Sequence, residues 1–104
     1  MRKITELASN ALLHGDSFTR DNTGVGGGAM FLHGHKIAEH TLHNTLILND
    51  CGWLTTTTKE RLNGVLETFN TGLSIYQKNY TWYIYNHETE TSSEWKSGAN
   101  VITL

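Results

Sequence analysis

The chain has 104 residues, of which 38% are hydrophobic and only 17% are charged, so its length suits one domain with a modest core. Eight Lys and Arg residues against ten Asp and Glu give a formal charge of −2, which disfavours nucleic-acid binding through a broad basic face. Cys51 is the only cysteine, so no intramolecular disulfide can form and the chain suits a reducing compartment.

The N-terminal segment, Lys3 to His14, has the pattern of an amphipathic helix. Its apolar residues recur at intervals of three and four, and Gly15 stands where a helix commonly ends. The segment has no continuous apolar run, so we expect neither a signal peptide nor a membrane span. A short strand is predicted at Asp16 to Arg20, followed by a glycine-rich loop over residues 21–28 (DNTGVGGG).

Three short segments then read as an antiparallel meander. Ala29 to Leu32 is apolar and strand-like, His33-Gly34-His35 predicts a tight turn, and Lys36 to His40 forms the returning strand. Thr45 to Asn49 is predicted to be the third strand, with its apolar residues on both faces.

The central segment predicts the best-formed helix, at about residues 57–69. Thr57 is the expected N-cap, and Glu60 completes a capping box three residues later. Trp53 is expected to be an apolar plug before the helix. The predicted buried stripe is Leu62, Val65, Leu66 and Phe69, whereas Glu60, Gly64 and Glu67 are expected to face water.

The C-terminal third predicts an aromatic hairpin and a polar tail. Leu73 to Gln77 and Tyr80 to Tyr85 form the hairpin strands, with the turn at Lys78-Asn79. The polar segment 87–98 is expected to be mobile, with Trp95 docking back onto the core. Helices and antiparallel strands together predict a single α+β domain over residues 1–104.

The aromatic hairpin is the leading candidate for a partner-binding surface. Both hairpin strands carry tyrosines, Tyr76 on the first and Tyr83 and Tyr85 on the second, and tyrosine is a common anchor residue in protein interfaces. The alternative is that the first helix and the tail cover both faces of the hairpin. Lys59, Arg61 and Asn63 form a polar helix edge that the fold does not obviously require. An unpaired strand edge would also allow two copies to form a homodimer.

Two further surfaces give alternatives. The helix start, with Thr55, Thr58, Lys59 and Arg61, together with Lys78 on the hairpin, suits phosphate contacts and favours a small nucleic-acid-binding protein. The side chains of His33, His35, His40 and His43 are suitable zinc ligands, although their spacing is not diagnostic of a metal site.

No catalytic residue is assigned. Cys51 is the strongest nucleophile in the chain, but nothing in the sequence places a general base beside it. The sequence therefore predicts a protein that is not an enzyme and needs no cofactor.

Several short motifs resemble a group of small tailed-bacteriophage proteins. They are Leu32-His33-Gly34, Ile37-Ala38-Glu39, Gly52-Trp53, the run Thr55-x-Thr57-Thr58-Lys59-Glu60-Arg61-Leu62-Asn63, and Ile75-Tyr76-Gln77-Lys78. The resemblance covers residues 32–85. It implies an accessory protein made in the host bacterial cytoplasm that binds a host or defence protein, in some cases as an inhibitor.

Overall fold

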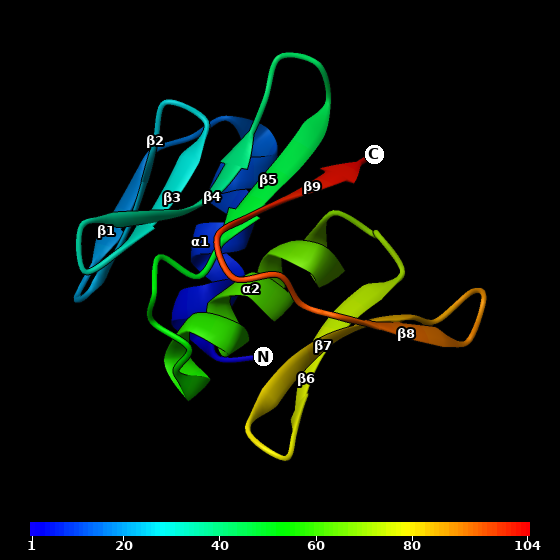
Figure 1. Cartoon of the computed structure of the whole chain (residues 1–104). Helices are drawn as coiled ribbons and strands as arrows, with labels where there is room; N and C mark the ends of the chain where they lie inside the picture. The colour runs from blue at the N-terminus through cyan, green and yellow to red at the C-terminus, as the bar shows by residue number, and fades with distance from the viewer.

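Helix α2 lies between two antiparallel sheets in the computed structural model of the chain, which describes residues 1–104 (Figure 1). The two helices and nine strands confirm the predicted α+β class. The elements are α1 (Lys3–His14), β1 (Phe18–Arg20), β2 (Thr23–Gly26), β3 (Ala29–Leu32), β4 (His35–His40), β5 (Thr45–Asn49), α2 (Thr56–Thr68), β6 (Leu73–Lys78), β7 (Thr81–Asn86), β8 (Thr91–Glu94) and β9 (Ala99–Thr103).

The larger sheet has six strands in the order β1-β2-β3-β4-β5-β9. Strands β1 to β5 follow one another as a meander, and β9 returns from the end of the chain to pair with β5. Residues 21–28 were predicted to be a loop, and this is wrong because they contain β2. Thr23 and Val25 alternate into the core, and Val25 pairs with Met30 of β3. This two-residue alternation, with glycines on the other face, decides the structure of the segment.

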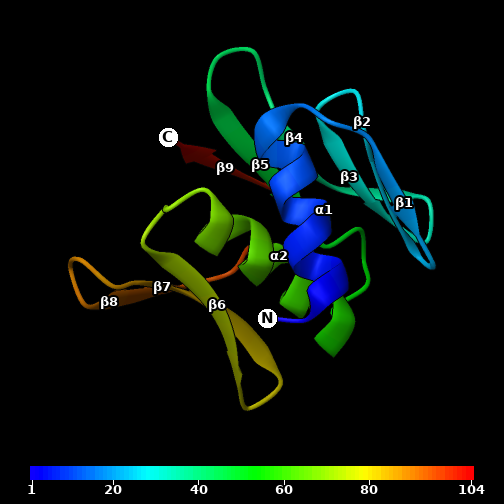
Figure 2. The ribbon, with the colours of Figure 1, turned by 180° about the vertical axis from the view of Figure 1, so that it is seen from behind.

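Helix α1 covers one face of the six-stranded sheet and lies alongside α2 (Figure 2). The predicted helix is confirmed, and Gly15 ends it with a left-handed φ of 73°. Its most buried side chains are Thr5, Ala8, Ser9, Ala11 and Leu12, so the buried stripe turns toward α2 and leaves Leu7 36% exposed. Neither helix is long and apolar enough to cross a membrane.

Helix α2 begins at Thr56, one residue earlier than predicted, and its N-cap lies two residues earlier. The N-cap is Thr55 rather than Thr57, because the Thr55 hydroxyl accepts a hydrogen bond from the Thr58 amide at 3.2 Å. Glu60 therefore completes no capping box. It accepts hydrogen bonds from Thr5 of α1 and from the amide of Arg2, the N-cap residue of α1. Of the predicted stripe, Leu62, Val65 and Leu66 are fully buried, whereas Phe69 lies beyond the helix end and is half-buried.

Gly64 is buried at the crossing of the two helices, so the expectation that it faces water is wrong. A Cβ atom at this position would collide with Thr5 Cγ2 and lie 3.1 Å from Ser9 Oγ. The absence of a side chain lets α1 and α2 approach closely. This close approach compensates for the low helix propensity of glycine, which costs about 1 kcal/mol relative to alanine.

Replacing Gly64 with Ala is expected to lower the free energy of unfolding by about 1–3 kcal/mol, because overpacking outweighs the gain in helix propensity. Urea denaturation followed by circular dichroism measures the change. Thr68→Ala, on the same helix but away from α1, is the control. A stabilised Gly64→Ala variant would show that the two helices can move apart freely.

The smaller sheet has the order β6-β7-β8 and packs against α2. The hairpin is confirmed, with its turn at Asn79-Tyr80, one residue later than predicted. Segment 87–98, expected to be mobile, contains β8, which pairs with β7. Trp95 follows β8 and is buried against Trp82, so its predicted docking is confirmed.

Candidate functional site

The outer face of the three-stranded sheet, turned away from α2, carries the three tyrosines predicted to bind a partner. Tyr76 and Tyr83 are directly opposite each other on β6 and β7, and their rings stack with centroids 5.3 Å apart. Tyr85 lies two residues along β7, on the same face. We call Tyr76, Tyr83 and Tyr85 the aromatic face.

The aromatic face remains open to solvent. Tyr76 is 36% exposed, while Tyr83 and Tyr85 are half-buried by their neighbours on the sheet. Helix α1 packs on α2 and the larger sheet, and β8 extends the small sheet sideways. The alternative in which the first helix and the tail cover both faces of the hairpin is therefore wrong.

Polar contacts fix the positions of these rings. The Tyr76 hydroxyl donates a hydrogen bond to Ser92 Oγ of β8 at 3.0 Å, and the ring of His87 meets that of Tyr85 edge-on at 4.7 Å. Glu94 stands opposite Tyr83 on β8. The face thus combines ordered aromatic surface with a polar rim, as protein interfaces do.

The free edge of β6 in the same sheet is bound to α2 through Asn63. Its side-chain amide donates to the carbonyl of Ile75 at 2.8 Å and its Oδ1 accepts from the amide of Ile75 at 2.6 Å. Asn63 was predicted as a partner-binding residue that the fold does not require. Its amide instead replaces a strand partner for β6, so the expectation that the fold does not require Asn63 is wrong. Lys59 lies nearby, with Nζ 3.4 Å from Gln77 Oε1, and is separate from the aromatic face.

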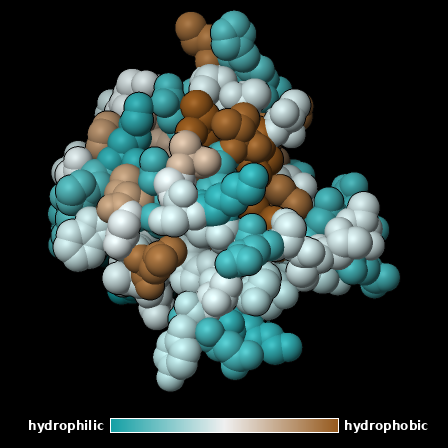
Figure 3. Space-filling model, in the orientation of Figure 1, coloured by the Kyte–Doolittle hydropathy of each residue, from teal (hydrophilic) through white to brown (hydrophobic).

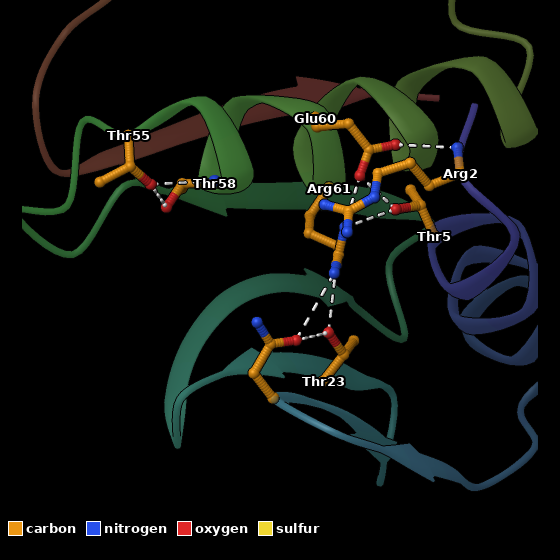
Figure 4. A network of polar contacts seen from close by, with 8 residues as sticks. Arg2, Thr5, Thr23, Thr55, Thr58, Glu60 and Arg61 are labelled. Carbon is orange, nitrogen blue, oxygen red and sulfur yellow. Dashed lines mark hydrogen bonds and ion pairs between the residues drawn. The ribbon is translucent and has the colours of Figure 1, made fainter.

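Arg61 is a buried structural residue, so its prediction as a partner or phosphate contact is also wrong. It is 1% exposed, and its guanidinium donates to Thr5 Oγ1 at 2.8 Å and to Thr23 Oγ1 at 3.1 Å (Figure 4). It also pairs with Glu60, which accepts from the amide of Arg2 at 3.3 Å. One charged side chain therefore links α2 to α1 and to β2.

The residues of the nucleic-acid alternative do not form a common surface. Thr58 is fully buried, its hydroxyl lies 3.0 Å from that of Thr55, and Arg61 points into the core. This leaves Lys59 and Lys78 as the basic residues of the set outside the core. A phosphate-binding surface needs several accessible cations, which this helix start does not provide.

The four predicted histidine ligands are spread over two places. His33 and His35 stand at a hollow of about 420 Å³ that is also lined by Leu32, Ile37 and Trp53. His40 packs edge-on against Phe69, and His43 is exposed in the β4–β5 loop. No three His, Cys, Asp or Glu side chains come together in a group that could hold a metal ion.

Trp53 borders the same hollow and is 56% exposed, so its prediction as an apolar plug is wrong. Its ring lies 6.0 Å from that of His35. The chain turns sharply before it, at Cys51 (φ 55°) and Gly52 (φ 80°), and this turn directs the indole outward.

Cys51 has the features of a structural thiol. Its Sγ donates to the carbonyl of Lys36 at 3.1 Å, and no histidine accepts from it. Burial, together with the negative charge of Asp50, raises the pKa of the Cys51 thiol above its ordinary value. A raised pKa keeps the thiol protonated at neutral pH, which is the opposite of nucleophile activation.

Asp50 is an important residue that sequence reasoning missed. It is fully buried, and its carboxylate accepts hydrogen bonds from Trp95 Nε1 at 2.8 Å, from the Gly98 amide at 3.2 Å and from the Gly52 amide at 2.7 Å. Ser97 Oγ adds a fourth donor at 3.3 Å. Asp50 thus connects the turn before α2 to the segment between β8 and β9.

Comparison with known proteins places the chain in a viral family. The model of the family described as Kyanoviridae Gp96 protein matches residues 1–102. No curated protein and no solved structure matches the chain. The match extends over nearly the whole chain, beyond the motifs at residues 32–85. The chain therefore belongs to the Kyanoviridae Gp96 protein family and is a bacteriophage protein.

Proposed function

We propose that this bacteriophage protein acts by binding, without catalysing a reaction, and that its aromatic face docks onto a protein of the host bacterium. The host protein belongs to the cytoplasm, and a component of host defence is the target that we favour. The observation that carries the proposal is the stacked, solvent-open pair of Tyr76 and Tyr83 on a sheet face that no other element covers.

The physical case begins with the nature of tyrosine. Its ring offers a large contact area with few rotatable bonds, and its hydroxyl makes hydrogen bonds where the ring is half-buried. The aromatic face is also ordered before binding. Tyr76 bonds to Ser92, and the backbone beneath it is held to α2 by Asn63. Such preorganisation lowers the conformational entropy lost on binding.

A non-enzymatic role agrees with the state of the strongest nucleophile. Cys51 donates to a backbone carbonyl and its pKa is raised, so it lacks the activation that covalent catalysis requires. A binding protein can still change the behaviour of its target. A phage protein that covers a working surface of a defence protein inhibits it in proportion to the amount bound.

The experiment begins with capture of a host protein by the tagged chain from nuclease-treated lysate, identification of that protein and measurement of Kd with both purified partners. Combining Tyr76→Ala with Tyr83→Ala is expected to weaken binding about 30-fold or more, because central aromatic anchors contribute about 2 kcal/mol or more. Calorimetry or surface plasmon resonance measures the Kd.

Tyr80→Asn is the matched control. Tyr80 belongs to the same hairpin and is 95% exposed, but it lies at the turn with a φ of 66°, which Asn tolerates. Its Kd should stay within about 2-fold of the parent value, because exposed residues outside an interface contribute little. An unchanged Kd in the double variant would refute the role of the aromatic face. Loss of capture on nuclease treatment would favour the nucleic-acid alternative instead.

A further inference from the structure

Strand β9 forms an edge of the six-stranded sheet that lacks the usual protection against pairing. The other sheet edges are short, charged or bonded: β1 has three residues and carries Arg20, β6 is bonded by Asn63 and ends in Lys78, and β8 ends in Glu94. By contrast, β9 (ANVIT) has no charge and no proline, and it pairs with β5 in an unbroken register. Natural proteins generally protect such an edge unless another strand covers it.

The outward backbone groups of β9 come from every second residue. Leu104 donates its amide to the carbonyl of Asn44 at 3.3 Å, so the antiparallel pattern turns the backbone groups of residues 100 and 102 toward β5. The amides and carbonyls of Ala99, Val101 and Thr103 consequently point away from the sheet. These three residues are symmetric about Val101.

The surroundings of this edge are open and partly apolar. Val101 is 65% exposed and stands opposite the half-buried Ile47 of β5, and apolar side chains gather over β5 and β9 (Figure 3). A hollow of about 380 Å³ lies beside β9. Ile84, Trp95 and Ile102 line it together with the oppositely charged Glu94 and Lys96. The protein's own chain therefore leaves room for an additional strand.

We propose that β9 pairs antiparallel with β9 of a second copy, across a two-fold axis at Val101. Ala99 then pairs with Thr103 of the second copy, and Val101 pairs with its own equivalent. Each outward amide and carbonyl gains a partner, and the two Val101 side chains bury each other between the two Ile47 side chains.

The charge of the strand favours a second copy over an unrelated partner. Two uncharged β9 strands do not repel each other, and the formal charge of each chain is only −2. A charged strand from another protein would find no opposite charge on β9 to select it. The dimer leaves the aromatic face free, so this proposal does not depend on the proposed function.

The first test is the mass of the purified full chain by size-exclusion chromatography with light scattering. The expected mass is twice the 11.7 kDa of one chain. Val101→Lys places a charge on the two-fold axis and is expected to halve the mass, without loss of the circular dichroism spectrum because Val101 is exposed. The control is Leu42→Lys, at a fully exposed position in the β4–β5 loop, which should keep the mass of the dimer.

The second test reads the register through disulfides in a Cys51→Ser background. Val101→Cys is expected to form a disulfide-linked dimer on oxidation, since paired Cα atoms about 5.5 Å apart lie within disulfide range. Thr103→Cys should not crosslink to itself, because its equivalent lies about 14 Å along the strand. Mixing Ala99→Cys with Thr103→Cys should restore the crosslink.

Three results would overturn the dimer. They are a monomer mass for the parent chain, a dimer mass that Val101→Lys leaves unchanged, and crosslinking of Thr103→Cys to itself in place of Val101→Cys. Masses above the dimer would point to head-to-tail pairing of β9 with β1 and would also refute the two-fold arrangement.

Discussion

Replacing Arg61 with Met is expected to lower the free energy of unfolding by about 3 kcal/mol or more, because a buried ion pair loses one partner. Methionine fills much of the same volume but donates no hydrogen bond. The hydroxyls of Thr5 and Thr23 then lose a donor, and Glu60 loses the cation beside it. Urea denaturation at neutral pH measures the change.

A second variant at Arg61 separates the effect of its positive charge from the effect of its several N–H donors, and a variant at Lys59 is the control. Arg61→Lys keeps the charge but cannot reach α1 and β2 at once, so a loss of about 1–2 kcal/mol is expected. Lys59→Met, on the same helix with one long polar contact, should change stability by no more than about 0.5 kcal/mol. Equal losses for Arg61→Met and Lys59→Met would contradict a structural role for the buried guanidinium.

The position of Arg61 explains why the sequence wrongly predicted this residue as a partner-binding or phosphate-binding residue. An arginine on a helix that starts with four threonines has the composition of a phosphate-binding surface. Its partners lie 38 and 56 residues earlier in the chain, on β2 and α1. No local pattern reveals such a contact. Asn63 is a similar case, because its polar group is satisfied by a strand edge that only the folded chain brings near.

Predictions from residue alternation and periodicity were more successful, because those signals are local. The alternating rings of the hairpin predicted an outer aromatic face, and the structure places Tyr76, Tyr83 and Tyr85 there. The apolar intervals of α1 and α2 located both helices. The count of glycines in residues 21–28 concealed the alternation of Thr23 and Val25, so β2 was missed. In this segment the two-residue alternation of side chains predicts the structure better than the amino-acid composition does.

The contacts of Asp50 are a further case in which the sequence reveals the local partner of a residue but not its distant partners. An Asp followed by Cys and Gly after a strand is typical of a turn residue that bonds its own backbone, and Asp50 does accept from Gly52. Its other partners, Trp95, Ser97 and Gly98, come more than 40 residues later. The sequence predicted that Trp95 docks, but it gave no indication of where.

Replacing Asp50 with Asn is expected to lower the free energy of unfolding by about 3 kcal/mol, since a buried carboxylate with several donors makes strong hydrogen bonds. The amide of Asn turns an NH₂ group toward donors that need an acceptor. The control is Asp16→Asn, because Asp16 is exposed. This variant should change the free energy of unfolding by no more than about 0.5 kcal/mol. Urea denaturation measures both.

The bond from Trp95 can be isolated with a double-mutant cycle. Trp95→Phe keeps an aromatic ring against Trp82 but removes the Nε1 donor, so Asp50→Asn and Trp95→Phe should be non-additive by about 1–2 kcal/mol. Hydrogen exchange provides a local readout. In Asp50→Asn, the β9 amides bonded to β5 should exchange faster relative to those of α2, because Asp50 anchors the segment that leads into β9. Additive stabilities, with unchanged exchange in β9, would show that packing of Trp95 alone holds the C-terminal strand on the sheet.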